Sequence, residues 1–217
     1  MSLLDEITQA AVDRVQNRFY GVAIGIVSNV DDPLFQGRVK IRLPWFNDDE
    51  ESAWARVAAP TAGGDRGIYF IPKVKDEVLV AFEQGNLETP YILGSLWSTR
   101  AMPPERIPRE GKSVIKTESG HVIEFDDNQR SIKIITADDQ KVTLEPTKIE
   151  VANSAGSMKV TLDDGSQTLT LESPANLELK GQSIKINGTS VEINGDAKTD
   201  VKAGGNLTIK GAMVMIN

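Results

Sequence analysis

The chain has 217 residues and a formal net charge of −7, which argues against a protein that coats nucleic acid. It contains no cysteine and a single histidine, His121, which excludes disulfides, thiolate chemistry and a multi-histidine metal site within one chain. We expect neither a cofactor nor a bound metal. No apolar run is long enough for a membrane span or a secretory signal, so we expect a soluble chain made in the cytoplasm.

Residues 1–18 are predicted to form a short helix with Ser2 as its N-cap. Apolar residues recur at three- and four-residue spacing and form a narrow stripe: Leu4, Ile7, Ala11 and Val15. A lone helix of this length is marginally stable in water, so the stripe should pack against another surface. That surface is either the rest of its own domain or a neighbouring subunit.

Residues 19–100 contain short runs of alternating apolar and polar residues, separated by turn-forming residues. Six runs are predicted to be strands: 20–27, 37–43, 54–58, 67–71, 77–82 and 91–96. Strands of this number and spacing indicate a small closed barrel. The tryptophans Trp45, Trp54 and Trp97 all lie in this segment, which therefore has the composition of an ordinary globular core.

Residues 101–111 are rich in proline and charge and are predicted to be a linker. Beyond it, residues 112–217 carry a short repeat in which two apolar residues flank one residue that is usually polar. The apolar pairs are Ile132/Ile134, Val142/Leu144, Ile149/Val151, Val160/Leu162, Leu169/Leu171, Leu177/Leu179, Ile184/Ile186, Val191/Ile193, Leu207/Ile209 and Val214/Ile216. This period of two predicts strands with one face in and one face out. A repeat this short indicates a solenoid or an intertwined fibre.

Each unit offers two or three inward side chains that are β-branched or Leu, which suits a narrow core. A single-chain β-helix would need caps at both ends, and no capping segment is visible. Three chains wound together would instead pair each strand with a neighbour's strand and leave open edges only at the tip. We therefore predict an all-β homotrimer whose C-terminal half is an intertwined triple-stranded β-helix, in which folding and assembly are one event.

Several motifs in a fixed order resemble the phage baseplate assembly protein V and VgrG-like central spike family of contractile injection systems. The motifs are 32–41 (DPLFQGRVKI), 54–57 (WARV), 63–64 (GG), 72–74 (PKV), 77–82 (EVLVAF), 90–94 (PYILG) and 119–127 (SGHVIEFDD). The resemblance implies an OB-fold barrel over residues 19–100 and a spike β-helix over residues 112–217.

The resemblance also implies a trimeric, non-enzymatic spike at the centre of a baseplate, with its barrels on a hub and its β-helix pointing at the target membrane. The stripe in residues 1–18 is then the candidate hub-docking surface. The chain has no large hub-like domain before the barrel and no lysozyme-like insertion after it, so a separate hub protein is expected and any wall-degrading activity would belong to another protein. The particle would be a virion tail baseplate or an equivalent injection device, assembled in the bacterial cytoplasm.

The candidate tip is the C-terminal segment: Met213, Val214, Met215, Ile216 and Asn217. Some short spikes of this family end in a histidine-bound metal, whereas this segment contains no histidine. Met213 and Met215 stand where earlier repeats place polar residues, so three chains would present a blunt apolar end. Exposed apolar patches usually mark interfaces, and we predict that a small PAAR-like conical protein caps this one. A frayed hydrophobic terminus is the alternative.

Two other functions are compatible with the sequence. One is a nucleic-acid- or sugar-binding barrel with a fibrous stalk, although residues 48–51 form an acidic run in a barrel loop and basic residues do not cluster with aromatic ones along the chain. The other is a β-helical enzyme that acts on polysaccharide through carboxylate pairs. The pairs are Asp126/Asp127, Asp138/Asp139 and Asp163/Asp164. They fall in predicted turns, where solvated turn residues are the simpler interpretation, and we predict no catalytic residue.

Overall fold

The structure is a computed structural model that describes residues 18–46, 50–104 and 110–215. Within these residues the fold is all-β, with strands β1 to β14 and one 3-10 turn, η1 (Glu83–Gly85). The helix predicted for residues 1–18 lies outside the described residues, except for Arg18, which forms an isolated β-bridge with Asn86. None of the described residues belongs to a helix long and apolar enough to cross a membrane.

The first sheet contains five strands in the order β2-β1-β6-β7-β3. Their bounds are β1 (Val22–Asn29), β2 (Lys40–Arg42), β3 (Arg56–Val57), β6 (Glu77–Phe82) and β7 (Pro90–Leu96). Neighbours pair antiparallel except β3 and β7, which are parallel. The sheet curls until its outer strands approach each other, where Val39 and Ala55 exchange backbone hydrogen bonds of 3.0 and 2.7 Å. This curled sheet confirms an OB-like barrel.

The barrel has its own hydrophobic core. Inward residues alternate with outward ones along β6, where Val78 and Val80 are 0% exposed and Phe82 is 8% exposed. The other buried apolar residues are Ala23, Val27, Val39, Ile41, Leu43, Ala55 and Ile92. Apart from Pro72 and Pro90, these are the buried apolar side chains in the part of the chain that the structure describes, and none lies beyond Ile92.

One predicted barrel strand is wrong. Residues 67–71 are not a strand, because the chain forms a small hairpin from β4 (Ala62–Gly63) and β5 (Arg66–Gly67) and then leaves the sheet. Gly67 adopts a φ of +145°, and a Cβ there would stand 2.6 Å from the carbonyl oxygen of Thr61. After this turn the side chains of Tyr69 and Phe70 are exposed rather than packed.

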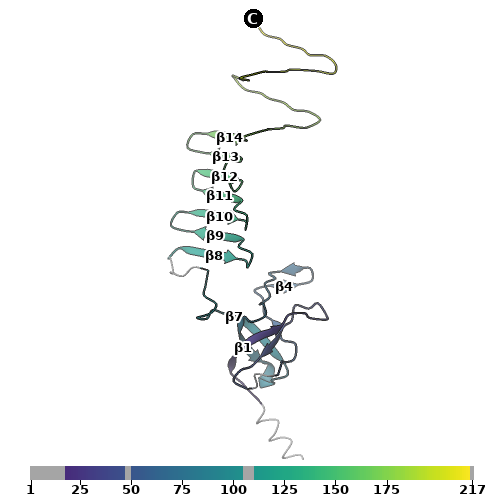
Figure 1. The fold of residues 1–217 in the computed structure, drawn as a ribbon, viewed down its shortest axis with the longest axis vertical. Helices are drawn as coiled ribbons and strands as arrows, with labels where there is room; N and C mark the ends of the chain where they lie inside the picture. Colours follow the sequence, from purple (N-terminus) through teal and green to yellow (C-terminus); the bar gives the residue numbers. More distant parts are fainter. Residues whose placement is uncertain (1–17, 47–49, 105–109, 216–217) are drawn as a thin grey trace, which may run out of the picture.

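The second sheet is an antiparallel meander of seven strands in chain order, β8 to β14. Their bounds are β8 (Lys112–Lys116), β9 (Val122–Asp126), β10 (Ser131–Ile135), β11 (Lys141–Glu145), β12 (Lys148–Ala152), β13 (Lys159–Asp163) and β14 (Thr168–Glu172). Figure 1 shows the strands stacked one above another along the long axis of the molecule. At about 4.8 Å per step this ladder reaches roughly 30 Å.

The pairing within the meander differs from the prediction for residues 112–217, in which every strand pairs with a neighbouring chain. Strands β8 to β14 pair with one another inside the chain. The reason is that short turns reverse the chain after each strand, for example Pro146 and Thr147 between β11 and β12. Hairpins of this kind pair consecutive strands without a second chain.

Residues 173–215 have a different conformation. They contain no strand, and none of them makes a backbone–backbone hydrogen bond within the described part of the chain. Extended runs alternate with bends at 174–175, 182, 189–190, 196–197, 204–205 and 212. In Figure 1 this segment sweeps from side to side beyond β14 toward the C-terminus. The predicted apolar pairs from Leu177/Leu179 to Leu207/Ile209 therefore lie in runs that form no strand pairing within the described chain, and Ile216 of the last pair lies outside the described residues.

A buried carboxylate organises the loop between β1 and β2. Asp32 accepts hydrogen bonds from the backbone N–H groups of Leu34, Gln36 and Arg38, at 3.0, 2.9 and 3.3 Å. The Arg38 guanidinium binds both carboxylate oxygens, at 2.7 and 3.0 Å. The bond from Arg38 is the main cause that holds the pKa of Asp32 well below its usual range, and the backbone donors act in the same direction. The motif at 32–41 is thus explained by local structure.

We predict that Asp32→Asn lowers the melting temperature at neutral pH, because the amide removes the charge that Arg38 and three N–H groups bind. A carboxylate with a lowered folded-state pKa stabilises the fold above its ordinary pKa and loses this effect as the pH falls toward the lowered value. The difference between the two proteins should therefore shrink in acid. Asp31→Asn, at an exposed neighbour, is the matched control. Equal melting curves for Asp32→Asn and the unmodified chain at pH 7 would contradict this role.

Candidate functional site

The strand register of the meander gathers apolar side chains on one face of the sheet, in two columns that cross the strands. The first column is Phe125, Ile132, Leu144, Ile149, Leu162 and Leu169. The second column is Ile115, Ile123, Ile134, Val142, Val151, Val160 and Leu171. Directly opposite residues in a sheet lie close enough for side chains to touch, so each column is continuous. We call these two columns the apolar face.

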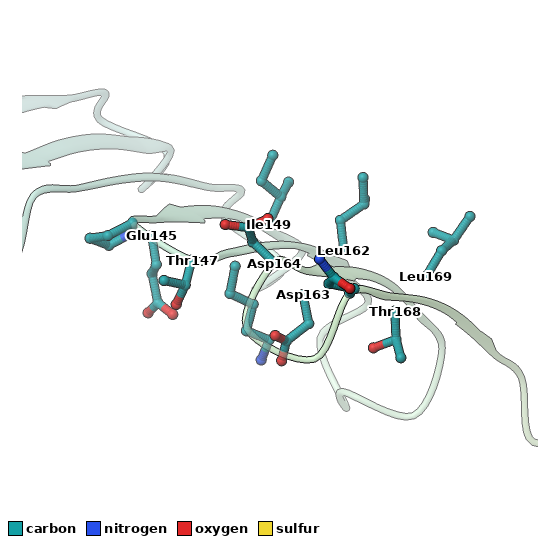
Figure 2. A pocket seen from close by; sticks show the side chains of 11 residues that line it. Glu145, Thr147, Ile149, Leu162, Asp163, Asp164, Thr168 and Leu169 are labelled. Atoms are coloured by element: carbon teal, nitrogen blue, oxygen red, sulfur yellow. The ribbon is translucent and has the colours of Figure 1, made fainter.

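The apolar face is open to solvent in the single chain. Its exposed members range from 37% exposure at Ile132 to 66% at Leu169, whereas the barrel core is at most 8% exposed. Figure 2 shows Ile149, Leu162 and Leu169 projecting from the same side of neighbouring strands. A continuous exposed apolar surface of this length is unusual in a monomeric protein and marks an interaction surface.

The opposite face of the meander is mostly polar and carries ion pairs. Lys112 contacts Glu124 at 3.0 Å, and Lys148 contacts Glu150 at 2.7 Å. The pair at Lys148 lowers the pKa of Glu150 and raises the pKa of Lys148. Partly exposed pairs of this kind contribute little to stability, so their main effect is to keep this face compatible with water. The two faces therefore differ sharply in what they can contact.

A shallow depression near the turns that join β11 to β12 and β13 to β14 holds three carboxylates, Glu145, Asp163 and Asp164. In Figure 2 the side chains of Glu145 and Asp163 project away from Ile149 and Leu162. Asp163 accepts a hydrogen bond of 2.9 Å from the backbone N–H of Ser166, which lowers its pKa. A general acid for glycoside cleavage needs the opposite shift. This carboxylate is suited to holding a turn.

The barrel places basic side chains beside aromatic rings, which the order of residues along the chain does not reveal. The Arg38 guanidinium lies 5.7 Å and the Lys40 ammonium 5.6 Å from the ring centre of Trp54. Both cations already have acidic partners, since Arg38 binds Asp32 at 2.7 Å and Lys40 binds Glu51 at 3.2 Å. These pairs reduce the positive charge that a nucleic-acid backbone would contact.

His121 has a structural contact. Its Nδ1 accepts a hydrogen bond of 3.1 Å from the backbone N–H of Ala137, which ties the turn before β9 to the turn after β10. Among the residues that the structure describes, no three His, Asp or Glu side chains gather as metal ligands.

The sequence-predicted interaction residues lie at the two ends of the chain. Leu4, Ile7, Ala11 and Val15 lie outside the described residues. At the other end, Met213, Val214 and Met215 are 79%, 52% and 82% exposed, while Ile216 and Asn217 are outside the described residues.

Three members of the apolar face escaped the sequence analysis: Ile115, Ile123 and Phe125. Ile123, Glu124 and Phe125 follow the same apolar-polar-apolar pattern as the later repeats, so the signal was present. Phe125 also shows that the face includes an aromatic side chain, contrary to the expectation of β-branched residues and Leu alone.

Comparison with known proteins identifies relatives of the barrel. Residues 23–97 match the family described as the Type VI secretion system/phage-baseplate injector OB domain. "Actin cross-linking toxin VgrG1" and "Type VI secretion system spike protein VgrG3", both of Vibrio cholerae, are each 35% identical over 88 residues. "Type VI secretion system spike protein VgrG5" of Pseudomonas aeruginosa is 38% identical over 88 residues.

These matches cover part of each protein. The aligned segment is 38% of this chain and 8%, 9% and 11% of the three relatives. The resemblance of the barrel motifs is thereby confirmed, and the relatives carry most of their length outside the shared segment.

Proposed function

We propose that this chain, whose residues 23–97 belong to the Type VI secretion system/phage-baseplate injector OB domain family, is the trimeric central spike of a contractile injection apparatus. The observation that carries the proposal is that the strands following a barrel of this family expose a continuous apolar face. Full burial of a Val, Leu or Ile side chain contributes roughly 1.5–3 kcal/mol, so covering the face would stabilise an assembly strongly. The names of the matched relatives include two spike proteins, which supports the same role.

The width of the apolar face favours three chains. Each strand from β9 to β14 contributes two side chains to it, and β8 contributes one, so three sheets facing one axis place six side chains in a layer at each strand from β9 onward. Val, Ile and Leu side chains fill such a narrow core, whereas a larger ring would leave a hole that two side chains per sheet cannot fill. The ion-paired opposite faces would then form the outer surface of a stiff triangular shaft.

Residues 173–215, which follow β14 toward the proposed tip, also favour an assembly of several chains. Backbone N–H and C=O groups in ordered structure require partners, and this segment makes no backbone–backbone hydrogen bond within its own described chain. Extended runs separated by bends every seven or eight residues suit a chain that passes from one face of a three-sided shaft to the next. In the proposed spike these runs form the intertwined triple-stranded β-helix.

The partners follow from the two ends of the proposed spike. The barrels would sit on a separate hub protein, with Leu4, Ile7, Ala11 and Val15 as the docking stripe. The opposite end would present Met213, Val214, Met215, Ile216 and Asn217 to a small PAAR-like conical protein, because exposed Met and Val side chains in three copies form an apolar patch. The shaft would then cross the target membrane transiently as a mechanical part without an active site.

We predict that the purified chain sediments as a trimer and that dilution removes assembly and the β-structure of the shaft together, since the shaft lacks a core of its own, whereas the barrel keeps its β-structure. Sedimentation velocity, with circular dichroism on the same samples, measures both. A monomer that keeps the β-signal of the shaft would overturn the proposal, and a stable dimer would overturn the three-fold core.

We predict that Val160→Lys prevents trimer formation, because three ammonium groups would be buried at the axis and unpaired buried ions cost several kcal/mol each. Thr161→Lys is the matched control, since it adds the same side chain to the same strand on the polar face, opposite Glu150. Native mass measurement reads out both variants. A trimer in Val160→Lys with unchanged melting temperature would show that the apolar face is not the assembly core.

We predict that replacing Met213 and Met215 together with Asp abolishes binding of the PAAR-like protein from the same apparatus, while the trimer persists. Asn206→Asp with Thr208→Asp adds the same number of acids at polar positions of the preceding repeat and should leave binding intact. Co-purification of the PAAR-like protein with each variant is the measurement. Equal capture by the Met variant would contradict the tip assignment.

A further inference from the structure

Two loops lie at the end of the barrel from which the chain continues to the meander. Strands β1 and β7 end there, and β2 and β6 begin there, because β1 pairs antiparallel with β2 and β6, and β7 pairs antiparallel with β6. The loops 30–39 and 58–76 are therefore both at the end where the chain leaves β7 toward β8. In Figure 1 the hairpin of β4 and β5, within the second loop, projects from the barrel on the side of the meander.

These loops expose three aromatic side chains. Phe35, Tyr69 and Phe70 are 95%, 78% and 65% exposed, although the meander of the same chain is present. Phe35 and Tyr69 line one shallow hollow together with Gly37. Gly37 has a φ of +69°, and a Cβ there would stand 3.2 Å from the ring of Tyr69, so this ring lies against the first loop. We call Phe35, Tyr69 and Phe70 the barrel-end patch.

One contact joins the loop of Tyr69 and Phe70 to the meander. The Lys73 ammonium pairs with the carboxylate of Glu118, in the turn between β8 and β9. Both side chains are exposed, so the pair contributes little stability. Its value here is positional, because it shows that the loop reaches the level at which the meander begins.

The apolar face of the meander is incomplete at that same level. Strand β8 contributes Ile115 to the second column, whereas Ser113 stands opposite Phe125 in the first column. Three chains would therefore supply three apolar side chains to the layer at β8, against six in each layer that follows. Ile115 and Phe125 are themselves 45% and 40% exposed. We call this layer, with Ile115 and Phe125, the base of the apolar face.

We propose that the barrel-end patch of each copy packs against the base of a second copy's apolar face, where Tyr69 and Phe70 fill the place left by Ser113. A second copy is the occupant because the chain's own meander leaves the patch exposed. The inference deepens the proposed spike and rests on it for the number of copies. The patch and the base are different surfaces, so the contact is heterologous, and repeating it around an axis closes a ring.

The contact would connect the barrels to the shaft mechanically. Without it, the covalent link between β7 and β8 and the exposed pair of Lys73 and Glu118 are what hold a barrel to the meander. Packed aromatic side chains bury a large area and interlock with their neighbours. Each barrel would then keep a fixed orientation about the axis, and a force on the barrels would pass into the shaft through three packed contacts.

The first test cross-links the two surfaces through cysteines, because the natural chain contains none. A Phe70→Cys chain is co-assembled with a size-tagged Ser113→Cys chain, treated with a short bis-maleimide and run on denaturing electrophoresis. We expect a product that contains one chain of each size, since the patch of one copy lies at the base of another. Glu88→Cys in place of Phe70→Cys is the matched control, because Glu88 is exposed at the opposite end of the barrel and should give no mixed product.

The second test measures access to the base. In the native assembly Ser113→Cys should react with a maleimide about tenfold more slowly than Glu88→Cys, because burial protects a thiol. Adding Phe70→Asp should restore fast labelling of Ser113→Cys, since a charged side chain would not stay packed against Ile115. Tyr20→Asp is the matched control, because it removes an aromatic side chain that is 74% exposed at the opposite end of the barrel.

The outcomes separate this inference from the proposed function. A trimer by native mass that gives no mixed product would overturn the contact and leave the spike standing. Equal labelling of Ser113→Cys with and without Phe70→Asp would overturn it as well. A monomer by native mass would overturn both the contact and the spike. A mixed product together with faster labelling in the Phe70→Asp variant would establish that the patch covers the base of a different copy.

Discussion

Exposed apolar surface is unfavourable in water, and backbone N–H and C=O groups require partners once they are buried away from water. In the C-terminal half of this chain, an exposed apolar face is followed along the sequence by a segment without backbone–backbone hydrogen bonds. The meander from β8 to β14 satisfies its backbone by hairpins but leaves one whole face of Val, Ile and Leu uncovered. Beyond Ser173 the described chain makes no backbone–backbone hydrogen bond. In the proposed assembly, the approach of other copies would cover the apolar face and supply partners to the unpaired backbone groups.

The barrel shows the contrast within one molecule. Its sheet curls around a buried apolar core, and the bridge between Val39 and Ala55 joins its outer strands. Asp32 holds the first loop by accepting hydrogen bonds from the Arg38 guanidinium and from backbone N–H groups. The barrel needs no second chain to bury these groups. The barrel buries its core within one chain, whereas the shaft would bury its apolar face only in an assembly. In the proposed spike, the barrel would therefore fold within each chain, and the shaft would become stiff only when the chains assemble.

The charged groups of the shaft serve this arrangement. Carboxylates in the turns, such as Asp163, are held in the ionised form by N–H donors, and lysine–glutamate pairs cover the polar face. These interactions keep the polar face of the meander compatible with water. The function proposed for the chain therefore depends on shape and rigidity rather than on chemistry at a site.

The sequence by itself determined the all-β class, a small barrel and the strands at Ile132/Ile134 through Leu169/Leu171, because the alternation of apolar and polar residues that predicts a strand is a local property of the chain, and the resemblance of the motifs added the OB type of the barrel. It also marked the apolar side of each strand. It missed the hairpin that replaces residues 67–71, because the conformation at Gly67 depends on the carbonyl of Thr61 nearby. The tertiary structure alone decided that β8 to β14 pair within the chain and that this pairing stops at β14. The same apolar-polar-apolar pattern occurs on both sides of Ser173, and whether a strand pairs with its own chain depends on the path of the turn that follows it, which periodicity does not encode.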